Sequence, residues 1–250
     1  MTFDETQSSA RPVETAFHEN EPHQGRIGGK LNWLRAGVLG ANDGIVSTAG
    51  VVIGVAGAAQ GNVLAIATAG VAALVAGAFS MAGGEYVSVS TQRDTEQALI
   101  EKEKRELAEE PELELQELAG LYRQRGLSEE VALRVAEELT AHDALAAHAE
   151  VELGIDPEEL TSPWSAALSS FVAFTVGALL PLIMILLPLG EHRVWAAAVA
   201  VVIGLIATGW ISAALGNAPR GRAIMRNVVM GSATMLATYG IGLAFGVAVS

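Results

Sequence analysis

An acidic residue lies within an otherwise apolar stretch near the start of the chain. Asp43 occupies the sequence Gly-Ala-Asn-Asp-Gly (40–44), about nine residues after Leu34, where the apolar run begins. A carboxylate at that depth in a membrane span costs several kcal/mol unless it meets a partner or water. On a helix it shares a face with glycines and with Ser47, small residues that let a second helix approach closely. We therefore expect Asp43 to face another helix or a pore; the alternative is a structural acid satisfied by Asn42 or a serine.

Two further residues of metal-binding type follow in the next apolar stretch. Met81 and Glu85 lie in Ser-Met-Ala-Gly-Gly-Glu (80–85), one helical turn apart on one face. A thioether, a carboxylate and an apposed Asp43 would form a mixed soft and hard site, which suits a borderline divalent transition metal such as Fe²⁺. The thioether disfavours Mg²⁺ and Ca²⁺, which prefer oxygen ligands. Taken alone, Met81 also fits a role as core filler, and Glu85 fits one as an interfacial acid.

A third set of candidate ligands lies in a strongly acidic, helix-patterned segment over 91–160. Glutamates recur there every three or four residues on both sides of Pro111, so two short helices could fold against each other and converge their carboxylates. In the next helix His148 and Glu152 are four residues apart and can chelate one ion. The alternative is a solvated charged face with incidental ion pairs. The candidate ligands are Glu103, Glu106, Glu110, Glu114 and Glu117 around Pro111, and Glu138, His142, His148 and Glu152 in the next helix.

Membrane-spanning helices are needed to position these residues. Hydrophobic residues make up 51% of the 250-residue chain and its net charge is −13, which agrees if apolar and charged residues occupy different solvents. Apolar runs long enough to cross a hydrocarbon core of ~30 Å predict two spans before the acidic segment and three after it. The fold class is an all-α membrane protein with five transmembrane helices and a three-helix cytoplasmic insert between spans two and three. The expected spans are 34–58, 63–81, 166–189, 195–215 and 227–250.

The acidic segment has the start and stop signals of three helices. No Gly-Pro turn separates span two from it, so we expect span two to continue straight into a first helix over 91–109. Pro111 suits the first turn of a second helix, and Ser128 followed by two glutamates is typical of the start of a third, which ends at Gly154. The expected domains are a mobile N-terminal arm (1–30), spans one and two (31–90), the acidic metal-binding domain (91–162) and spans three to five (163–250).

Basic residues near the span ends predict the orientation in the membrane. They precede span one and recur in the loop expected between spans four and five, whereas the opposite side carries only Arg193. The N-terminus and the insert are therefore expected in the cytoplasm. The basic residues on that side are Arg26, Lys30, Arg35, Arg220, Arg222 and Arg226. No removable signal peptide is expected. His18 and His23 in the arm could deliver a metal, although an arm without a chemical role is the simpler interpretation.

Several classes of function lack their signatures. The chain has no cysteine, so any metal site must use carboxylate, imidazole, thioether or backbone ligands. No Ser-His-Asp set, phosphate-binding glycine loop or dinucleotide fingerprint occurs in its required context. We therefore expect no enzymatic activity, no tightly bound cofactor and no nucleic-acid partner.

Three motifs resemble the vacuolar iron transporter family. They are Gly-Ala-Asn-Asp-Gly-Ile-Val-Ser-Thr (40–48), Ser-Met-Ala-Gly-Gly-Glu-Tyr-Val-Ser (80–88) and Gln-Arg-Asp-Thr-Glu (92–96). The likeness covers nearly all of 34–250, including the order of two spans, acidic insert and three spans. It implies a homodimer that exchanges cytosolic Fe²⁺, and often Mn²⁺, for protons. It also implies an ion path between subunits lined by the first spans, and a cytoplasmic metal-binding role for the insert.

The resemblance also implies site residues by position. The family's membrane aspartate falls on Asp43 and its span-two methionine on Met81. Its insert glutamates, in two ExxE pairs and one later position, fall on Glu103, Glu106, Glu114, Glu117 and Glu152. Some relatives have adjacent methionines just before the last glutamate, where this chain has His148-Ala149, so an imidazole replaces a thioether.

The resulting hypothesis is a proton-coupled antiporter that exports Fe²⁺ or Mn²⁺ from the cytosol. Its partners are divalent metal ions, protons, the lipid bilayer and a second copy of the chain. It would lie in the plasma membrane of a bacterium or in a vacuolar-type membrane of a eukaryote. The alternative is a membrane-anchored metal buffer or sensor without flux, which leaves Asp43 unexplained. A transporter of an organic substrate is disfavoured, because the spans lack a cluster of polar residues able to recognise one.

Overall fold

The computed structural model describes residues 27–59, 61–157 and 160–249, and within these ranges the chain is helical without β-strands. The all-α architecture predicted from the sequence is therefore confirmed. His18 and His23 lie outside the described residues, as does most of the expected arm. The end of that arm differs from the prediction, because helix α1 (Ile27–Ala58) begins at Ile27.

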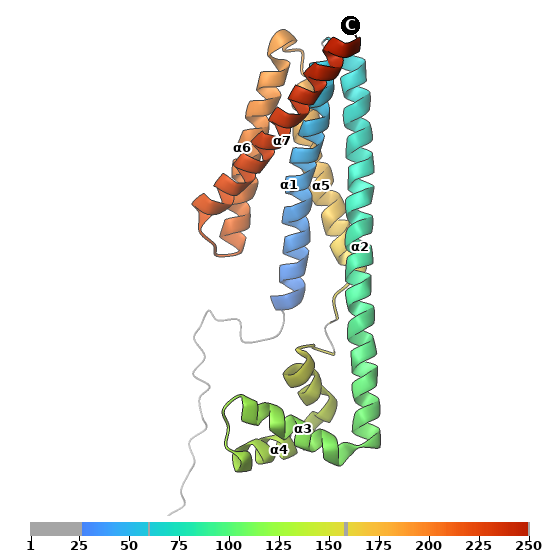
Figure 1. The fold of residues 1–250 in the computed structure, drawn as a ribbon, viewed down its shortest axis with the longest axis vertical. Coiled ribbons are helices and arrows are strands. Elements are labelled where there is room, and N and C mark those ends of the chain that lie inside the picture. Colours follow the sequence, from blue (N-terminus) through green and yellow to red (C-terminus); the bar gives the residue numbers. More distant parts are fainter. Residues whose placement is uncertain (1–26, 60, 158–159, 250) are drawn as a thin grey trace, which may run out of the picture.

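Five helices are long and apolar enough to cross a membrane, as predicted. They are α1, α2 (Val63–Glu109), α5 (Pro163–Leu186), α6 (Arg193–Leu215) and α7 (Arg220–Val249). Helix α5 packs against both α1 and α2, while α7 packs against α1 and α6 (Figure 1). Their shared core is aliphatic and lies around the second half of α1. This bundle holds the part of α1 that carries Asp43.

Glycines bring α1 and α5 into close backbone contact beside Asp43. A Cβ atom added at Gly44 would collide with the backbone carbonyl of Phe174, and one added at Gly177 would collide with that of Ala41. Any side chain at either position would push the two helices apart, which is the physical reason for small residues there. The backbone around Asp43 is thus fixed against α5.

Helix α2 is 47 residues long and continues out of the bundle without a break (Figure 1). Its N-terminus is capped by Asn62, whose side chain accepts a hydrogen bond of 3.0 Å from the backbone N–H of Ala65. The predicted continuity of span two with the first insert helix is confirmed. The expected domain boundary between residues 90 and 91 consequently lies inside one continuous helix.

Beyond α2 the chain forms α3 (Pro111–Gln124), α4 (Glu129–His148) and a π-helical turn, η1 (Ala149–Leu153). Figure 1 shows them at the end of α2 that projects from the bundle. Pro111 occupies the first turn of α3, as predicted, and α3 packs against α4 through Leu118 and Ala136. Gly154 ends the last turn in the left-handed conformation, at φ 65°. These contacts give the segment a small core of its own.

The third insert helix is less regular than the sequence predicted. Ser128 occupies the N-cap position of α4, but its side chain makes no capping hydrogen bond. The backbone leaves the helical conformation at Asp143, whose Oδ1 accepts a bond of 2.9 Å from the N–H of Ala146 and so starts a new helical stretch. The π-helical turn follows this stretch. His148 and Glu152 therefore lie on a short segment that begins after the break.

The arginines expected in a loop between spans four and five are helical instead. Arg220 is the first residue of α7, so Arg220, Arg222 and Arg226 all belong to its first two turns. Arginine is a good helix former and no helix-breaking proline follows Pro219, which explains the earlier start than the predicted Asn227. The positive charge still lies at the same end of these helices as the N-terminus of α1 (Figure 1).

Candidate metal centres

A cavity of about 400 Å³ lies between α1, α2 and α5. Asp43 and Ser47 of α1 line it together with Met81 and Glu85 of α2, and Phe174 of α5 forms another wall. The structure thus places Asp43 in the same cavity as Met81 and Glu85, the pair that helical spacing put on one face of α2. The set offers a thioether and two carboxylates, the donors that a borderline transition metal accepts. Metal binding by these residues stays a prediction.

The Asp43 side chain is partly buried and faces this cavity. Within the described ranges its carboxylate has no hydrogen bond or ion pair to the protein, since Ser47 Oγ donates instead to the Asp43 backbone carbonyl at 2.6 Å. Asn42 does not satisfy it either, and Asn42 Oδ1 is itself buried without a hydrogen-bond partner. The interpretation of Asp43 as an acid held by Asn42 or a serine therefore has no support in the contacts.

Glu85 differs from Asp43 in having a cationic partner. Its Oε1 lies 3.4 Å from Nη2 of Arg35, so an ion pair connects α2 with α1. The Glu85 side chain is 11% exposed and that of Arg35 is 64% exposed. Sequence reasoning used Arg35 only for membrane orientation and missed this contact. The sequence signal that could have indicated a role near the cavity was the position of Arg35, about two turns before Asp43 on the same helix.

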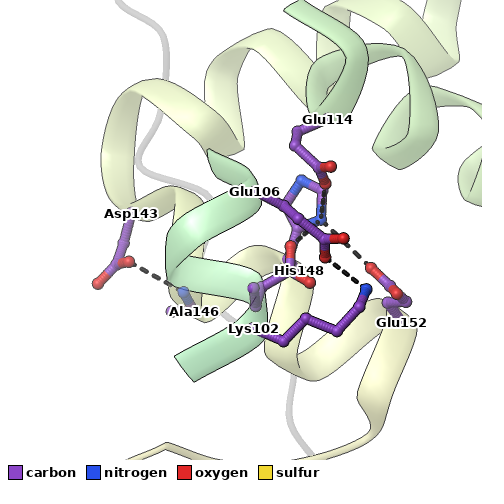
Figure 2. Close-up of polar contacts among 8 residues, drawn as sticks. Lys102, Glu106, Glu114, Asp143, Ala146, His148 and Glu152 are labelled. Carbon is purple, nitrogen blue, oxygen red and sulfur yellow. Dashed lines mark hydrogen bonds and ion pairs between the residues drawn. The ribbon is translucent and has the colours of Figure 1, made fainter. Parts of the chain in front are cut away.

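A second group of ligands gathers where α2, α3 and the end of α4 meet (Figure 2). Nδ1 of His148 lies 2.8 Å from Oε1 of Glu103, 3.4 Å from Oε2 of Glu152 and 3.6 Å from Oε2 of Glu114. His148, Glu103 and Glu114 are buried, and their ligand atoms all lie within 4.8 Å of one another. We call these four residues the insert cluster. Its dimensions suit one divalent cation.

The insert cluster concentrates negative charge away from water. Burial raises the pKa of Glu103, and repulsion from the Glu152 carboxylate raises it further. Burial is also the main cause that raises the pKa of Glu114, with a contribution from Glu117. The opposing effect of His148 is smaller at both sites. Carboxylates crowded in this way gain from any bound proton or cation that neutralises them.

Two of the predicted insert ligands lie outside this group. Glu106 Oε2 pairs with Nζ of Lys102 at 2.6 Å, and its side chain is 38% exposed (Figure 2). Glu117 is exposed on α3. The contacts therefore separate a buried set, Glu103, Glu114 and His148 with Glu152 at its edge, from two flanking glutamates. Spacing alone could not make this distinction, because all four ExxE glutamates recur at helical intervals.

Comparisons with known proteins agree with the motifs that line these sites. The model of the VIT family matches residues 34–243. A vacuolar iron transporter from Acanthamoeba castellanii is 42% identical over 225 residues, which are 90% of this chain and 82% of the relative. Vacuolar iron transporter homolog 1 from Oryza sativa subsp. japonica is 40% identical over 222 residues, 87% of this chain and 75% of the relative.

A relative from Arabidopsis thaliana, vacuolar iron transporter homolog 2, is 35% identical over 213 residues, 85% of this chain and 84% of the relative. These alignments extend far beyond the short motifs, and the described residues include five helices able to span a bilayer. The protein is an integral membrane protein, and its chain belongs to the VIT family.

Proposed function

We propose that this protein transports Fe²⁺, and also Mn²⁺, out of the cytosol in exchange for protons. The observation that carries the proposal is the meeting of Asp43 and Met81 in one cavity between membrane-spanning helices. An acid whose carboxylate has no partner among the described residues is costly between apolar helices and fits a place where cations pass. The relatives are named vacuolar iron transporter and vacuolar iron transporter homolog 1, and these names support a metal as the cargo.

The proposed coupling depends on competition for one carboxylate. A partly desolvated carboxylate holds a proton or a metal ion, but rarely both. A metal ion that reaches Asp43 and Met81 from the cytosol is displaced when a proton arrives from the other side. Met81 contributes a soft donor that makes the site more selective for Fe²⁺ than for Mg²⁺. Proton binding thus releases the metal ion on the far side.

The insert cluster would act as the cytosolic collector. One of its residues, Glu103, lies on α2, the helix that also carries Met81 and Glu85, and the charge of the cluster attracts divalent cations. The proposed place of the insert in the cytoplasm follows from the basic residues at the same end of the bundle. The host membrane would be the plasma membrane in a bacterium and a vacuolar-type membrane in a eukaryote.

A homodimer with the ion path along α1 and α2 belongs to the same proposal. Gly83 and Gly84 lie on an exposed part of α2, and a Cβ atom at either position would meet no other atom within 4 Å. A helical glycine costs about 1 kcal/mol relative to alanine, and small residues on an exposed helix face allow a second helix to approach closely. A second copy packed there would use the space beside the cavity.

Flux through reconstituted protein tests the proposal. Liposomes with an acidic lumen and an internal Fe²⁺-sensitive dye should take up Fe²⁺ and Mn²⁺ and lose luminal protons at the same time. Asp43→Asn should reduce both signals to the level of empty liposomes, because the amide cannot exchange a proton for a metal. Glu137→Gln, which changes an exposed acid of α4 outside the motifs and the candidate sites, is the control and should retain flux.

The outcomes also separate transport from the alternative function. A membrane-anchored buffer or sensor would bind metal through the insert cluster but show no flux in the unmodified protein. Full activity of Asp43→Asn would refute the exchange mechanism even if metal crosses the membrane. A rate of Fe²⁺ transport that does not depend on the pH gradient would refute proton coupling.

A further inference from the structure

We propose that Arg35 is a specificity-determining residue that guards the cytosolic mouth of the Asp43 cavity. Its guanidinium occupies the position of an incoming cation on Glu85, and only a divalent ion displaces it effectively. The inference rests on the proposed function, because it concerns the cation that this cavity admits. It adds a residue that lies outside the cavity lining and controls access to it.

The placement of Arg35 follows from its contact with a cavity residue. Glu85 lines the cavity and is 11% exposed, whereas Arg35 is 64% exposed and reaches Oε1 of Glu85 at 3.4 Å. Glu85 follows Met81 by one turn toward the projecting end of α2, and Arg35 precedes Asp43 by about two turns on α1. Both residues therefore lie on the side of Asp43 and Met81 that faces the insert.

Charge neutrality gives this contact a selective effect. With both carboxylates ionised, Asp43 and Glu85 carry two negative charges, and Arg35 compensates one of them. A divalent ion that replaces the guanidinium makes the site neutral, whereas a divalent ion beside a bound guanidinium would leave a net positive charge. A monovalent ion offers no more charge than the guanidinium and so gains nothing by replacing it. Arg35 thus disfavours Na⁺ and K⁺ and raises the concentration of divalent ion needed for transport.

The exposed side chain makes the displacement feasible. Since the Arg35 side chain is 64% exposed, its guanidinium can move away from the cavity, and the incoming divalent ion then compensates the charge of Glu85. A surface ion pair is worth at most about 1 kcal/mol, and this one is exposed on the Arg35 side, so a divalent ion that takes over the contact with Glu85 can break it. The ion pair therefore sets the concentration of divalent ion needed for transport, because the metal ion must compete with the Arg35 guanidinium for the Glu85 carboxylate.

Transport kinetics of Arg35→Gln in liposomes test the inference. The KM for Mn²⁺ should fall up to about fivefold, as expected for loss of one exposed competing charge. Addition of 150 mM Na⁺ or K⁺, at an ionic strength held constant with a bulky organic cation, should inhibit Arg35→Gln at least twofold more than the unmodified protein. Arg35→Lys should restore discrimination against monovalent ions, since it retains the charge. Arg222→Gln removes an exposed arginine at the same end of the bundle and is the matched control.

A double substitution identifies Glu85 as the contact through which Arg35 acts. In a Glu85→Gln background, Arg35→Gln should change the KM for Mn²⁺ by less than twofold, because no carboxylate remains for the two cations to share. An unchanged KM and unchanged monovalent inhibition in Arg35→Gln would overturn the inference. So would loss of transport in both Arg35→Gln and Arg35→Lys when the proteins are folded. If the unmodified protein shows no flux, the proposed function fails instead, and the two failures are distinct.

Discussion

The cavity in the bundle and the insert cluster both present carboxylates to a cation, but they differ in charge density and in partners. The cavity combines Asp43 and Glu85 with a thioether, and an arginine already pairs with one of the two acids. The insert cluster packs three carboxylates around one imidazole, with most of these groups buried. Crowded anions hold a divalent ion firmly, whereas a transport site must also release it. We infer that the insert is built for capture and the cavity for exchange.

The largest effect expected from this contrast concerns binding without transport. The double substitution Glu103→Gln and Glu114→Gln should weaken equilibrium binding of Mn²⁺ by at least about 100-fold, since changes to residues beyond the ligands alone cost 10–100-fold. Flux at saturating metal should fall much less, because the Asp43 cavity is intact. Titration calorimetry and liposome flux measure the two quantities, with the exposed pair Glu129→Gln and Glu130→Gln as control. Equal loss of binding and flux would remove the distinction between capture and exchange.

The reciprocal effect should follow from a change in the cavity. Met81→Leu keeps the volume and removes the soft donor, so the KM for Fe²⁺ should rise about tenfold while binding to the insert cluster is unchanged. The KM for Mn²⁺, a harder ion, should rise less. Met225→Leu substitutes an exposed methionine of α7 and serves as control. An equal effect on both metals would mean that Met81 packs in the wall without selecting the ion.

A smaller effect concerns stability in the absence of metal. The raised pKa of Glu103 means that its ionised form destabilises the fold above that pKa, and that the penalty disappears as the pH falls toward the ordinary value of 4.5. Metal-free Glu103→Gln should therefore unfold a few degrees higher than the unmodified protein at pH 7.5, with the difference shrinking toward pH 4.5. Added Mn²⁺ should reverse the order. Thermal unfolding in detergent, with and without Mn²⁺, measures these differences. A metal-free variant that is less stable than the unmodified protein at pH 7.5 would show that the ionised Glu103 carboxylate does not destabilise the fold.

The smallest effect is expected at the edge of the insert cluster. Glu117 is exposed, so Glu117→Gln should change the affinity for Mn²⁺ less than about twofold through loss of a screened charge. Glu114→Gln, one helical turn away, should cost far more. Calorimetry on the two single variants compares them directly. Equal losses would place Glu117 among the ligands and enlarge the insert cluster.

Features that depend on one helix were predictable from the sequence. Span positions follow from runs of apolar residues, and Met81 with Glu85, or His148 with Glu152, follow from one-turn spacing. Features that depend on how two helices meet were not. The contact of Arg35 with Glu85 and the exclusion of Glu117 from the cluster both require the packing of separate elements.

The break at Asp143 shows a second limit. The sequence there has no glycine or proline, and nearby residues favour helix, so a continuous helix was the reasonable prediction. The side chain of Asp143 instead caps the N–H of Ala146 and stabilises a restart. Aspartate forms such local bonds in turns as well as at helix starts, so sequence alone could not select the outcome.

The uninterrupted length of α2 also restricts how this protein can change in evolution. Glu103 follows Glu85 by 18 positions, which is about five turns of 3.6 residues, so the two acids lie on the same side of the helix about 27 Å apart. One inserted or deleted residue between them would rotate the insert by about 100° about the helix axis relative to the bundle. We expect length variation among homologous chains to be rare between these positions unless it comes in near-whole turns. It should accumulate instead in the connections around α3 and α4, where an added residue does not rotate the insert relative to the bundle.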